Sequence, residues 1–418
     1  MAAQAARKRI LILTADAGFG HRSAANAIAA AMSELYGDLC DISIVNPLED
    51  RRAPFFLRDS GADYDKMVRN APELYKLGFD ASDATVPAVI AEQALIVLLF
   101  EVMRDLIRSA RPDVIVSTYP LYQAPLRSVM VVLRLQIPIL VTVTDLATVH
   151  RLWFSSSVDL CLAPTEQVRD LALNYGLRPE QVQVTGIPVN PKVMHEHRSK
   201  NEIRRALGWQ PDIITALAVG SRRVDRLIDS LNVINHFGIP IQIAVAAGKD
   251  QNLYRELQQI EWHVPVKLYE FANNIPEMMK AADFLVSKAG GLIVTESLAC
   301  GLPLLLIDVL PGQETGNADY VVQNGAGALA RSPVEVLETL SHWTMNEAVV
   351  LQHVAQNAQR LGRPNAAYEV ANAAWLWAQR TPSTGLPGTG RLRLIDLLST
   401  NQVRWEDENP APRTENAP

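Results

Sequence analysis

Short apolar runs alternate with longer helical patterns along this chain, and the whole alternation occurs twice. In the first half, runs of strand length lie at 9–14, 40–45, 114–117, 139–143, 160–163 and 182–184. In the second half they recur at 214–219, 241–246, 266–269, 284–286 and 304–307, before a helical pattern at 366–377. Strands that alternate with helices favour a parallel, doubly wound sheet. We therefore expect an α/β protein with two Rossmann-like domains.

The boundary between the halves is marked by glycine and proline. The stretch 186–191 reads GIPVNP and interrupts the alternation. We expect a first domain at 1–185, a linker at 186–200 and a second domain at 201–380. A chain of 418 residues with 48% hydrophobic content can build two cores. Beyond Thr381 the content of Pro, Gly, Ser and Thr rises, so 381–418 is expected to be disordered.

Small residues follow one apolar run of the second half. Ala289, Gly290 and Gly291 end the run 284–286 and begin a helical pattern. Without bulky side chains, the backbone N–H groups of a helix start are open to a phosphate. Glu296, one to two turns further, can accept hydrogen bonds from the vicinal hydroxyls of a ribose. This favours a nucleotide site, with a plain N-terminal helix charge as the alternative for Glu296.

A polar cluster follows the next apolar run, 303–309. After Pro311 it contains Gly312, Gln313, Glu314 and Asn317. Three polar side chains beside a Pro-Gly turn and a helix start can bind sugar hydroxyls. A loop cap or a solvated turn is the alternative for each of them.

Near the N-terminus, a turn with glycines joins a strand to a helix. The turn 15–20 follows the run 9–14, and from Arg22 apolar residues recur on one helical face. His21 is therefore expected at the carboxyl edge of a sheet, where open α/β folds bind ligands. A histidine, with a pKa of about 6.5, can act as a general base. A lone histidine in a loop is more often structural.

These motifs together resemble one enzyme family. SKAGG (287–291), TESLACGLP and PGQETGN are similar to the donor-binding half of family-28 glycosyltransferases, especially the monogalactosyldiacylglycerol synthases and processive diacylglycerol glucosyltransferases. GFGHRSA (18–24) resembles their G-G-G-H-R-A-S turn, with Phe19 in place of a glycine. VTDLATVHRLWF (143–154) resembles their T-D-L-x-T-x-H-x-x-W-F pattern. The resemblance implies a GT-B fold, in which two Rossmann-like doubly wound domains face a cleft.

The resemblance also implies roles for individual residues. His21 would be the base that takes the proton of the acceptor hydroxyl, with Gly20, Asp145 and His150 at the acceptor. A structural hydrogen bond is the alternative for Asp145 and His150. The implied donor-binding residues are Gly220, Ser221, Gly248, Lys249, Ser287, Lys288, Ala289, Gly290, Gly291, Glu296, Gly312, Gln313, Glu314 and Asn317.

Two positions depart from the family pattern. Tyr119 stands where a family motif normally carries histidine, so we assign it no catalytic role. Arg222 and Arg223 follow the first strand of the second domain, where the family has a glycine-rich loop. Two arginines there would crowd a pyrophosphate or bind it directly.

The expected activity is inverting transfer of galactose or glucose from UDP-galactose or UDP-glucose to diacylglycerol, giving a β-glycosyl-diacylglycerol. No Asp-x-Asp pair lies near a strand end, so we expect no metal and no cofactor, and helix N-termini and cations would stabilise the leaving UDP. Two alternatives share the fold. One is a peptidoglycan-type UDP-N-acetylglucosamine transferase, and the other a UDP-sugar 2-epimerase or an inactive sugar-binding protein.

Composition bears on the compartment and on partners. Cys40, Cys161 and Cys300 form no CxxC pair, which favours a reducing compartment without disulfides or a zinc site. No signal-type core or apolar stretch of about 18 residues occurs. We expect a cytoplasmic protein, peripherally associated with the cytoplasmic membrane, and no nucleic-acid partner.

Two segments could contact that membrane. The run 86–100 predicts either an amphipathic helix in the bilayer surface or an ordinary buried helix. Between Arg51 and Phe79, basic and aromatic residues alternate, which suits anionic lipid. The net charge is −6, so any attraction must come from such a local face.

Overall fold

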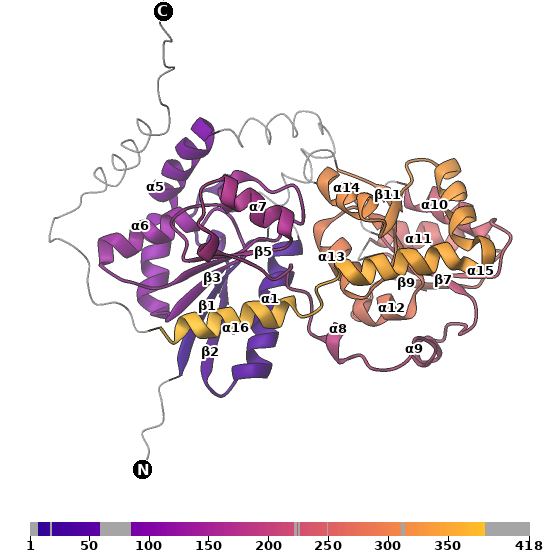
Figure 1. Cartoon of the computed structure of the whole chain (residues 1–418), viewed down its shortest axis with the longest axis horizontal. Coiled ribbons are helices and arrows are strands. Elements are labelled where there is room, and N and C mark those ends of the chain that lie inside the picture. The colour runs from indigo at the N-terminus through magenta and orange to yellow at the C-terminus, as the bar shows by residue number, and fades with distance from the viewer. Residues whose placement is uncertain are drawn as a thin grey trace, which may run out of the picture.

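The protein forms two α/β lobes that lie side by side (Figure 1). The structure, a computed structural model, describes residues 7–16, 19–58, 85–220, 224, 226–248, 250–310 and 314–380, without the side chains of 19, 55–56 and 85–91. Each lobe is built on a six-stranded parallel sheet. The expected class, two Rossmann-like doubly wound domains, is therefore confirmed. The predicted tail 381–418 and most of the basic and aromatic segment lie outside the described residues.

The first sheet reverses its strand order at β1. Its strands are β1 (Lys8–Leu13), β2 (Cys40–Val45), β3 (Val114–Ser117), β4 (Ile139–Thr142), β5 (Leu160–Ala163) and β6 (Val182–Val184). They lie in the order β2-β1-β3-β4-β5-β6, and all pairs are parallel. Open α/β sheets bind ligands where the order reverses, outside the carboxyl ends of the strands. That place is the end of β1 and β3.

Helices cover both faces of this sheet. The helices of the first lobe are α1 (Phe19–Tyr36), η1 (Pro47–Glu49), α2 (Phe55–Arg58), α5 (Thr85–Ala110), α6 (Gln123–Leu133), η2 (Arg151–Trp153), α7 (Glu166–Asn174) and η3 (Pro179–Gln181). Leu99, Met103 and Ile107 of α5 are buried in the core with α6. The segment 86–100 is thus part of a packed helix, although Val97 and Leu98 are exposed.

The last helix in the described part of the chain packs on the first lobe. α16 (Ala366–Ala378, yellow in Figure 1) contacts α1, β1 and β3. Its Val370, Ala371 and Ala374 are buried in the same cluster as Ile10 and Ile12 of β1. The expected second domain, 201–380, therefore has to be corrected at its end. Small alanines allow the close approach of two helices, but the sequence pattern does not say which sheet they cover.

The second sheet also consists of parallel strands, with one reversal of strand order. Its strands are β7 (Ile214–Val219), β8 (Ile241–Ala246), β9 (Val266–Tyr269), β10 (Phe284–Lys288), β11 (Leu304–Asp308) and β12 (Gly327–Leu329). Its order is β12-β11-β10-β7-β8-β9, with the reversal between β7 and β10. The accompanying helices are α8 (Lys192–His195), α9 (Lys200–Leu207), α10 (Leu227–Asn235), α11 (Gln251–Gln259), α12 (Ile275–Ala281), α13 (Gly291–Ala299), α14 (Thr315–Gln323) and α15 (Pro333–Leu361).

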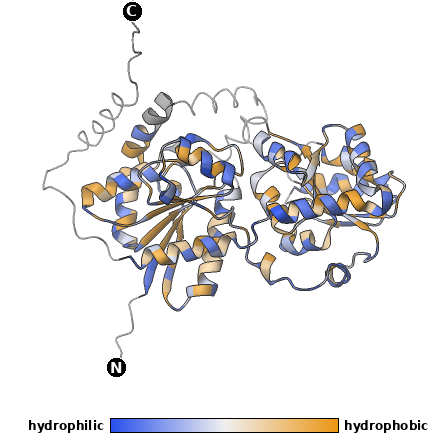
Figure 2. Ribbon diagram, viewed as in Figure 1, coloured by the Kyte–Doolittle hydropathy of each residue, from blue (hydrophilic) through white to orange (hydrophobic). Residues whose placement is uncertain are grey.

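The hydropathy of the strands and helices explains why helices cover both faces of each sheet. The strands are mostly apolar and the helices carry polar residues on one side (Figure 2). Phe284, Leu305 and Ile307 lie on one face of the second sheet, and Leu285, Leu304 and Leu306 on the other. Strands buried on both faces are near-continuous apolar runs, which is why the sequence revealed them. The three-residue strand β12 was not predicted, because its Gly-Ala-Leu run is too short to be recognised.

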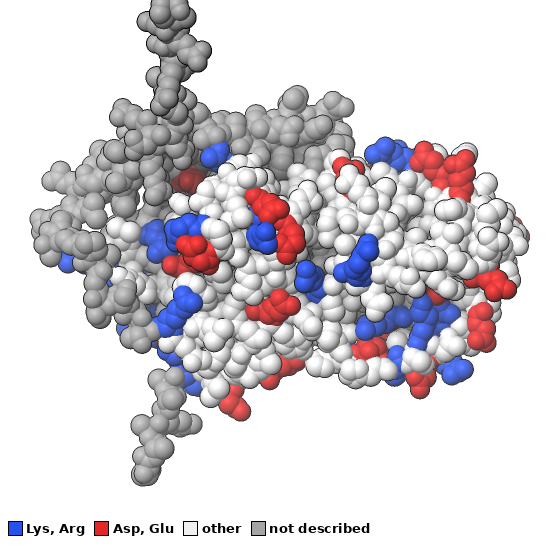
Figure 3. All heavy atoms as spheres, in the orientation of Figure 1, with Lys and Arg blue, Asp and Glu red and all other residues white. Residues whose placement is uncertain are grey.

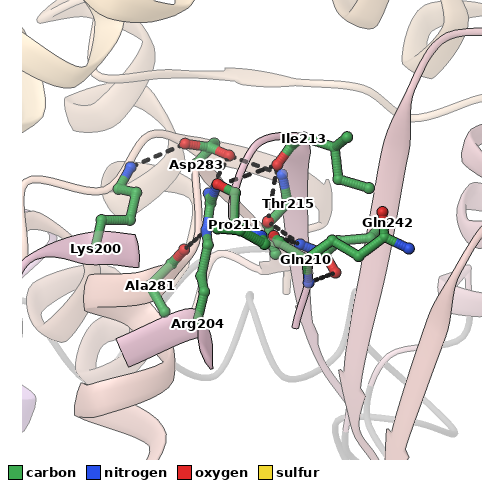
Figure 4. Close-up of polar contacts among 9 residues, drawn as sticks. All are labelled: Lys200, Arg204, Gln210, Pro211, Ile213, Thr215, Gln242, Ala281 and Asp283. Carbon is green, nitrogen blue, oxygen red and sulfur yellow. Dashed lines mark hydrogen bonds and ion pairs between the residues drawn. The ribbon is translucent and has the colours of Figure 1, made fainter. Parts of the chain in front are cut away.

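A buried arginine fastens α9 to the second sheet. The Arg204 guanidinium donates to the carbonyl oxygens of Ala281, Pro211 and Ile213 and pairs with Asp283 (Figure 4). Asp283 also accepts from the backbone N–H of Thr215 at 2.7 Å and pairs with Lys200. The Arg204 side chain is only 5% exposed. The network lies at the amino ends of β7 and β10, away from the ligand-binding edge.

Charge is dispersed over the face of the described residues that Figure 3 shows. In Figure 3, basic and acidic side chains are scattered, many as pairs of opposite sign, between broad uncharged areas. None of the helices in the described part of the chain combines the length and apolar character needed to cross a bilayer.

Candidate functional site

His21 is held in one tautomer by the end of β3. It lies in the first turn of α1, which begins at Phe19 and not at Arg22 as expected. His21 Nδ1 lies 2.8 Å from the backbone carbonyl oxygen of Thr118. A carbonyl oxygen only accepts hydrogen bonds, so Nδ1 must carry the proton in the neutral ring. Nε2 then has a free lone pair, and within the described residues it accepts no hydrogen bond. The ring is thus set up to take a proton at Nε2.

The surroundings of His21 adjust its affinity for a proton. Although the residue keeps some exposed surface, burial lowers its pKa below the ordinary 6.5, while the Asp145 carboxylate and the Thr118 carbonyl oppose that shift. A lowered pKa keeps the imidazole neutral near pH 7. Asp145 favours the imidazolium that forms when the ring accepts a proton. A lowered pKa together with a nearby carboxylate suits a general base, which is neutral before the reaction and carries a positive charge only after it accepts a proton.

Aromatic rings enclose the imidazole. The Tyr119 ring meets it edge-on with centroids 5.0 Å apart, and the Trp153 ring lies at 6.0 Å. Burial raises the pKa of Tyr119 to about 12, so this phenol stays protonated at neutral pH. Tyr119 therefore does not serve as a base at neutral pH, in agreement with the expectation that it has no catalytic role.

Two of the predicted acceptor residues, Asp145 and His150, lie in the segment after β4, and Gly20 directly precedes His21 in α1. Asp145 follows β4, and its Oδ2 accepts from the indole N–H of Trp153 at 2.7 Å. His150 begins η2 and accepts from the backbone N–H of Leu152 through Nδ1. Both residues therefore have the structural hydrogen bond named as their alternative. Asp145 in addition acts electrostatically on His21. Gly20 borders open space, since a Cβ there would meet no described atom within 4 Å.

The second half of the site is the reversal between β7 and β10. β10 leads into α13, whose N-cap is Gly290, as the sequence indicated. Glu296 projects from the second turn of α13, and burial raises its pKa to about 7. No hydrogen bond to its carboxylate occurs among the described residues. A desolvated carboxyl without donors is suited to accept ligand hydroxyls.

An ion pair lies beside the start of α13. Lys288 at the end of β10 pairs with Glu314, the N-cap of α14. Glu314 Oε2 also accepts from the backbone N–H of Leu310 at 3.0 Å. A Cβ at residue 290 would lie 3.5 Å from Lys288 Nζ, so the pair borders the glycines. Both oxygens of Glu314 thus already have protein partners, unlike those of Glu296.

Other predicted donor residues have structural partners as well. The Asn317 side chain donates to the carbonyl oxygen of Ala289 at 3.0 Å, which ties α14 to α13. Ser287 Oγ donates to the carbonyl oxygen of Val219 at 3.2 Å, which joins β10 to β7. These bonds bring together the ends of the strands at the reversal. Both residues therefore lie at the reversal between β7 and β10.

Two predicted glycines pack against each other. Gly248 has φ +67°, and a Cβ there would lie 2.5 Å from the carbonyl oxygen of Gly220. A Cβ at Gly220 would lie 2.6 Å from Leu253 Cδ2. Close packing therefore requires both glycines. Ser221, Lys249, Gly312, Gln313 and the two arginines 222–223 lie outside the described residues.

The two halves of the site meet. α1 contacts α13 across the lobes. A Cβ at Gly291 would lie 3.5 Å from the carbonyl oxygen of Thr144, and one at Gly316 would lie 1.9 Å from Thr148 Oγ1. The segment after β4 therefore touches the first turns of both α13 and α14. Sequence reasoning missed Thr118, Thr144 and Thr148, because their contacts are with residues far away in the chain.

Two protein-family models match the sequence. The model for monogalactosyldiacylglycerol (MGDG) synthase matches residues 21–189, and the model for the glycosyltransferase family 28 C-terminal domain matches residues 217–370. The chain is 34% identical over 378 residues to the chloroplastic monogalactosyldiacylglycerol synthase of Spinacia oleracea, over 87% of this chain and 72% of that protein. Monogalactosyldiacylglycerol synthase 3 of Arabidopsis thaliana is 33% identical, over 87% and 80%.

Solved structures share the architecture. They include MurG of Acinetobacter baumannii (TM-score 0.57, 16% identity, 88% of this chain and 99% of that one) and the calicheamicin glycosyltransferase CalG4 (0.54, 15%, 90% and 100%). The UDP-GlcNAc 2-epimerase of Neisseria meningitidis, bound to UDP-GlcNAc, has TM-score 0.56 at 15% identity, over 88% and 99%. At such identities the likeness concerns the fold alone, and it confirms the GT-B class.

Proposed function

Because the chain belongs to the monogalactosyldiacylglycerol synthase family, we propose that it transfers a hexose, galactose or glucose, from a UDP-sugar to diacylglycerol. The observation that carries the proposal is the fixed tautomer of His21. Its Nδ1–H is bound to the Thr118 carbonyl at 2.8 Å, so Nε2 is the proton acceptor. The helix that bears it contacts α13, the helix that would hold the donor.

The reaction follows from this arrangement. The free hydroxyl of diacylglycerol approaches Nε2 and gives up its proton as its oxygen attacks the anomeric carbon of the sugar. The bond between that carbon and the UDP oxygen breaks, and UDP leaves with the electron pair. Attack from the face opposite UDP inverts the configuration and yields a β-glycoside. Asp145 favours the imidazolium formed, because its carboxylate raises the proton affinity of His21.

The second lobe would bind the UDP-sugar. Backbone N–H groups at the start of α13 would meet the pyrophosphate, since Gly290 and Gly291 carry no side chains of their own that would stand in its way. Glu296 would accept the two ribose hydroxyls. The departing charge would be stabilised by this helix start and by Lys288. We propose that no metal ion takes part.

The acceptor is a lipid, so the first lobe should contact a bilayer. α5 and α6 pack against each other and expose Val97, Leu98 and Val132, and Leu135 just after α6 is exposed as well. Arg108 and Arg134 are exposed on or beside the same helices. Apolar side chains with nearby cations suit a peripheral contact with anionic lipid. The related plant enzymes are named chloroplastic, and a cytoplasmic membrane for this chain stays a prediction.

A direct assay tests the proposal. The purified protein is incubated with vesicles that contain diacylglycerol, with UDP-galactose or UDP-glucose in separate reactions, in EDTA or in magnesium. The extracted lipid is analysed by mass spectrometry, and the product's anomeric configuration by proton NMR. We expect β-glycosyl-diacylglycerol in EDTA from at least one donor. Product that requires magnesium would refute the metal-free part, and an α-glycoside would refute inversion.

A further inference from the structure

The segment after β4 touches the catalytic histidine and the second lobe at once. Thr144 Oγ1 lies 2.8 Å from His21 Nδ1. The carbonyl oxygen of the same residue faces Gly291, where an added Cβ would be 3.5 Å away. Thr144 is only 6% exposed. One buried residue thus links the proposed base to the first turn of the proposed donor helix.

The rest of the segment is anchored to the second lobe. Leu146 is 4% exposed and belongs to the apolar core cluster of that lobe, together with Ala289 and Val294. Thr148 packs so closely against Gly316 that a Cβ there would overlap its hydroxyl. On the other side, the Thr165 hydroxyl donates to the Leu146 carbonyl oxygen at 3.4 Å. The position of Thr144 is therefore set by both lobes.

We propose that Thr144 is a positioning residue, whose hydroxyl fixes the orientation of the His21 ring from a segment held by the donor-binding lobe. The inference rests on the proposed function, in which His21 is the base. Thr118 after β3 supplies one acceptor for Nδ1–H, and Thr144 after β4 supplies a second. Two acceptors from two directions restrict rotation of the ring, which one acceptor alone does not. Nε2 is then aimed at one place, as general-base catalysis requires.

The same hydroxyl should favour the cationic ring. When Nε2 takes the acceptor's proton, Nδ1–H becomes a charged donor, and its bonds to the two oxygens strengthen. Among the described residues, the other titratable groups near the ring are Asp145 after β4 and Tyr119 after β3, with the ion pair between Arg22 of α1 and Asp16 after β1. Only Asp145 among them acts on the proton affinity of His21. Removal of the Thr144 hydroxyl should thus make His21 a weaker base.

The test compares Thr144→Val, which keeps the shape and loses the hydroxyl, with Thr144→Ser, which keeps the hydroxyl. In the diacylglycerol assay, we expect Thr144→Val to lower kcat roughly tenfold with little change in the KM for UDP-sugar, and Thr144→Ser to recover most of that loss. A second readout needs no turnover. NMR of isotope-labelled histidine, assigned with His21→Asn, should show the His21 titration midpoint about one pH unit lower in Thr144→Val than in wild type.

The outcomes separate this inference from the proposed function. If wild type makes glycolipid and Thr144→Val matches it in kcat and midpoint, the inference is overturned and the function stands. If Thr144→Ser loses as much as Thr144→Val, the methyl packing matters and the hydroxyl does not, which also overturns it. If wild type makes no glycolipid, the proposed function fails, and the NMR midpoint alone decides whether Thr144 holds the ring.

Discussion

His21 in α1 and Thr118 at the end of β3 are joined by a hydrogen bond of 2.8 Å between Nδ1 and a backbone carbonyl oxygen. They are far apart in the chain, and the reversal of strand order brings them together. Since the acceptor is backbone, no side-chain substitution at 118 removes it directly. The tautomer of the proposed base is therefore determined by the fold itself. Asp145 and Thr144, which follow the neighbouring strand, then adjust its charge and orientation.

The first prediction concerns pH. Burial lowers the pKa of His21 below 6.5, and the base works only when unprotonated. With the UDP-sugar saturating, activity should therefore be constant near neutrality and fall as the pH drops through that lowered pKa. The measurement is kcat at saturating UDP-sugar against pH from about 5 to 8, so that the pH dependence of donor binding does not enter. Asp145→Asn removes a group that raises the pKa, so its acid limb should lie at still lower pH. An acid limb above about pH 7 would contradict the assignment.

A second prediction concerns the donor. Burial raises the pKa of Glu296 to about 7, and ligand hydroxyls that donate to its carboxylate should lower that pKa. Binding of UDP-galactose or UDP-glucose, whose pyrophosphate does not titrate here, should then release a proton. The affinity should weaken about tenfold as pH falls from about 8 to 6.

Calorimetry in two buffers of different ionisation enthalpy checks this. Glu296→Gln serves as the matched variant, since it keeps the size of the side chain and cannot ionise. It should bind more weakly and show no proton release. A pH dependence that persists unchanged in Glu296→Gln would assign the titration to another group.

The sequence predicted the strands well, because strands buried on both faces are continuous apolar runs. The glycines around Gly290 and the acid at 296 were recognised for a local reason, since a helix start and its first turns are close in the chain. Contacts between distant elements were not accessible in this way. Thr144 reads as an ordinary polar residue after a strand, and only the fold shows that its hydroxyl reaches His21.

The packing of α16 on the first lobe illustrates the same limit. Its alanine-rich face predicts that the helix is buried against a sheet, and both lobes have an apolar sheet. The sequence gives no reason to prefer the first lobe, whose β1 is over 350 residues away in the chain. Arg204 is a further case. It stands beside Arg205 in a polar helix, yet one is buried and the other exposed.

A third prediction compares Arg204 with Arg205. Arg204→Met should destabilise the protein by about 3 kcal/mol, because three carbonyl oxygens lose their donor and Asp283 loses a partner. Arg205→Met, on the exposed side of the same helix, should change stability by less than about 0.5 kcal/mol. Urea unfolding of both variants measures the difference. Equal stability of the two would mean that the Arg204 network contributes nothing net.

A fourth prediction concerns the contact between the lobes. Gly316→Ala places a Cβ 1.9 Å from Thr148 Oγ1 and 2.9 Å from the Thr148 backbone nitrogen. The segment after β4 must shift, and overpacking of this kind costs about 1–3 kcal/mol. We expect kcat/KM to fall roughly tenfold or more while the circular dichroism spectrum is unchanged. Thr148→Gly in the same chain should restore part of the loss, since it removes the hydroxyl and leaves the backbone nitrogen. Full activity of Gly316→Ala would show that this contact is not needed for transfer.

The most direct test of the central claim replaces the base. Wild type and His21→Ala are compared with diacylglycerol vesicles and UDP-galactose or UDP-glucose in EDTA, with UDP binding measured on both. We predict that the variant binds UDP as wild type does and forms glycosyl-diacylglycerol at least about a hundredfold more slowly. Equal rates of glycolipid formation by the two proteins would contradict the role of His21 as the base.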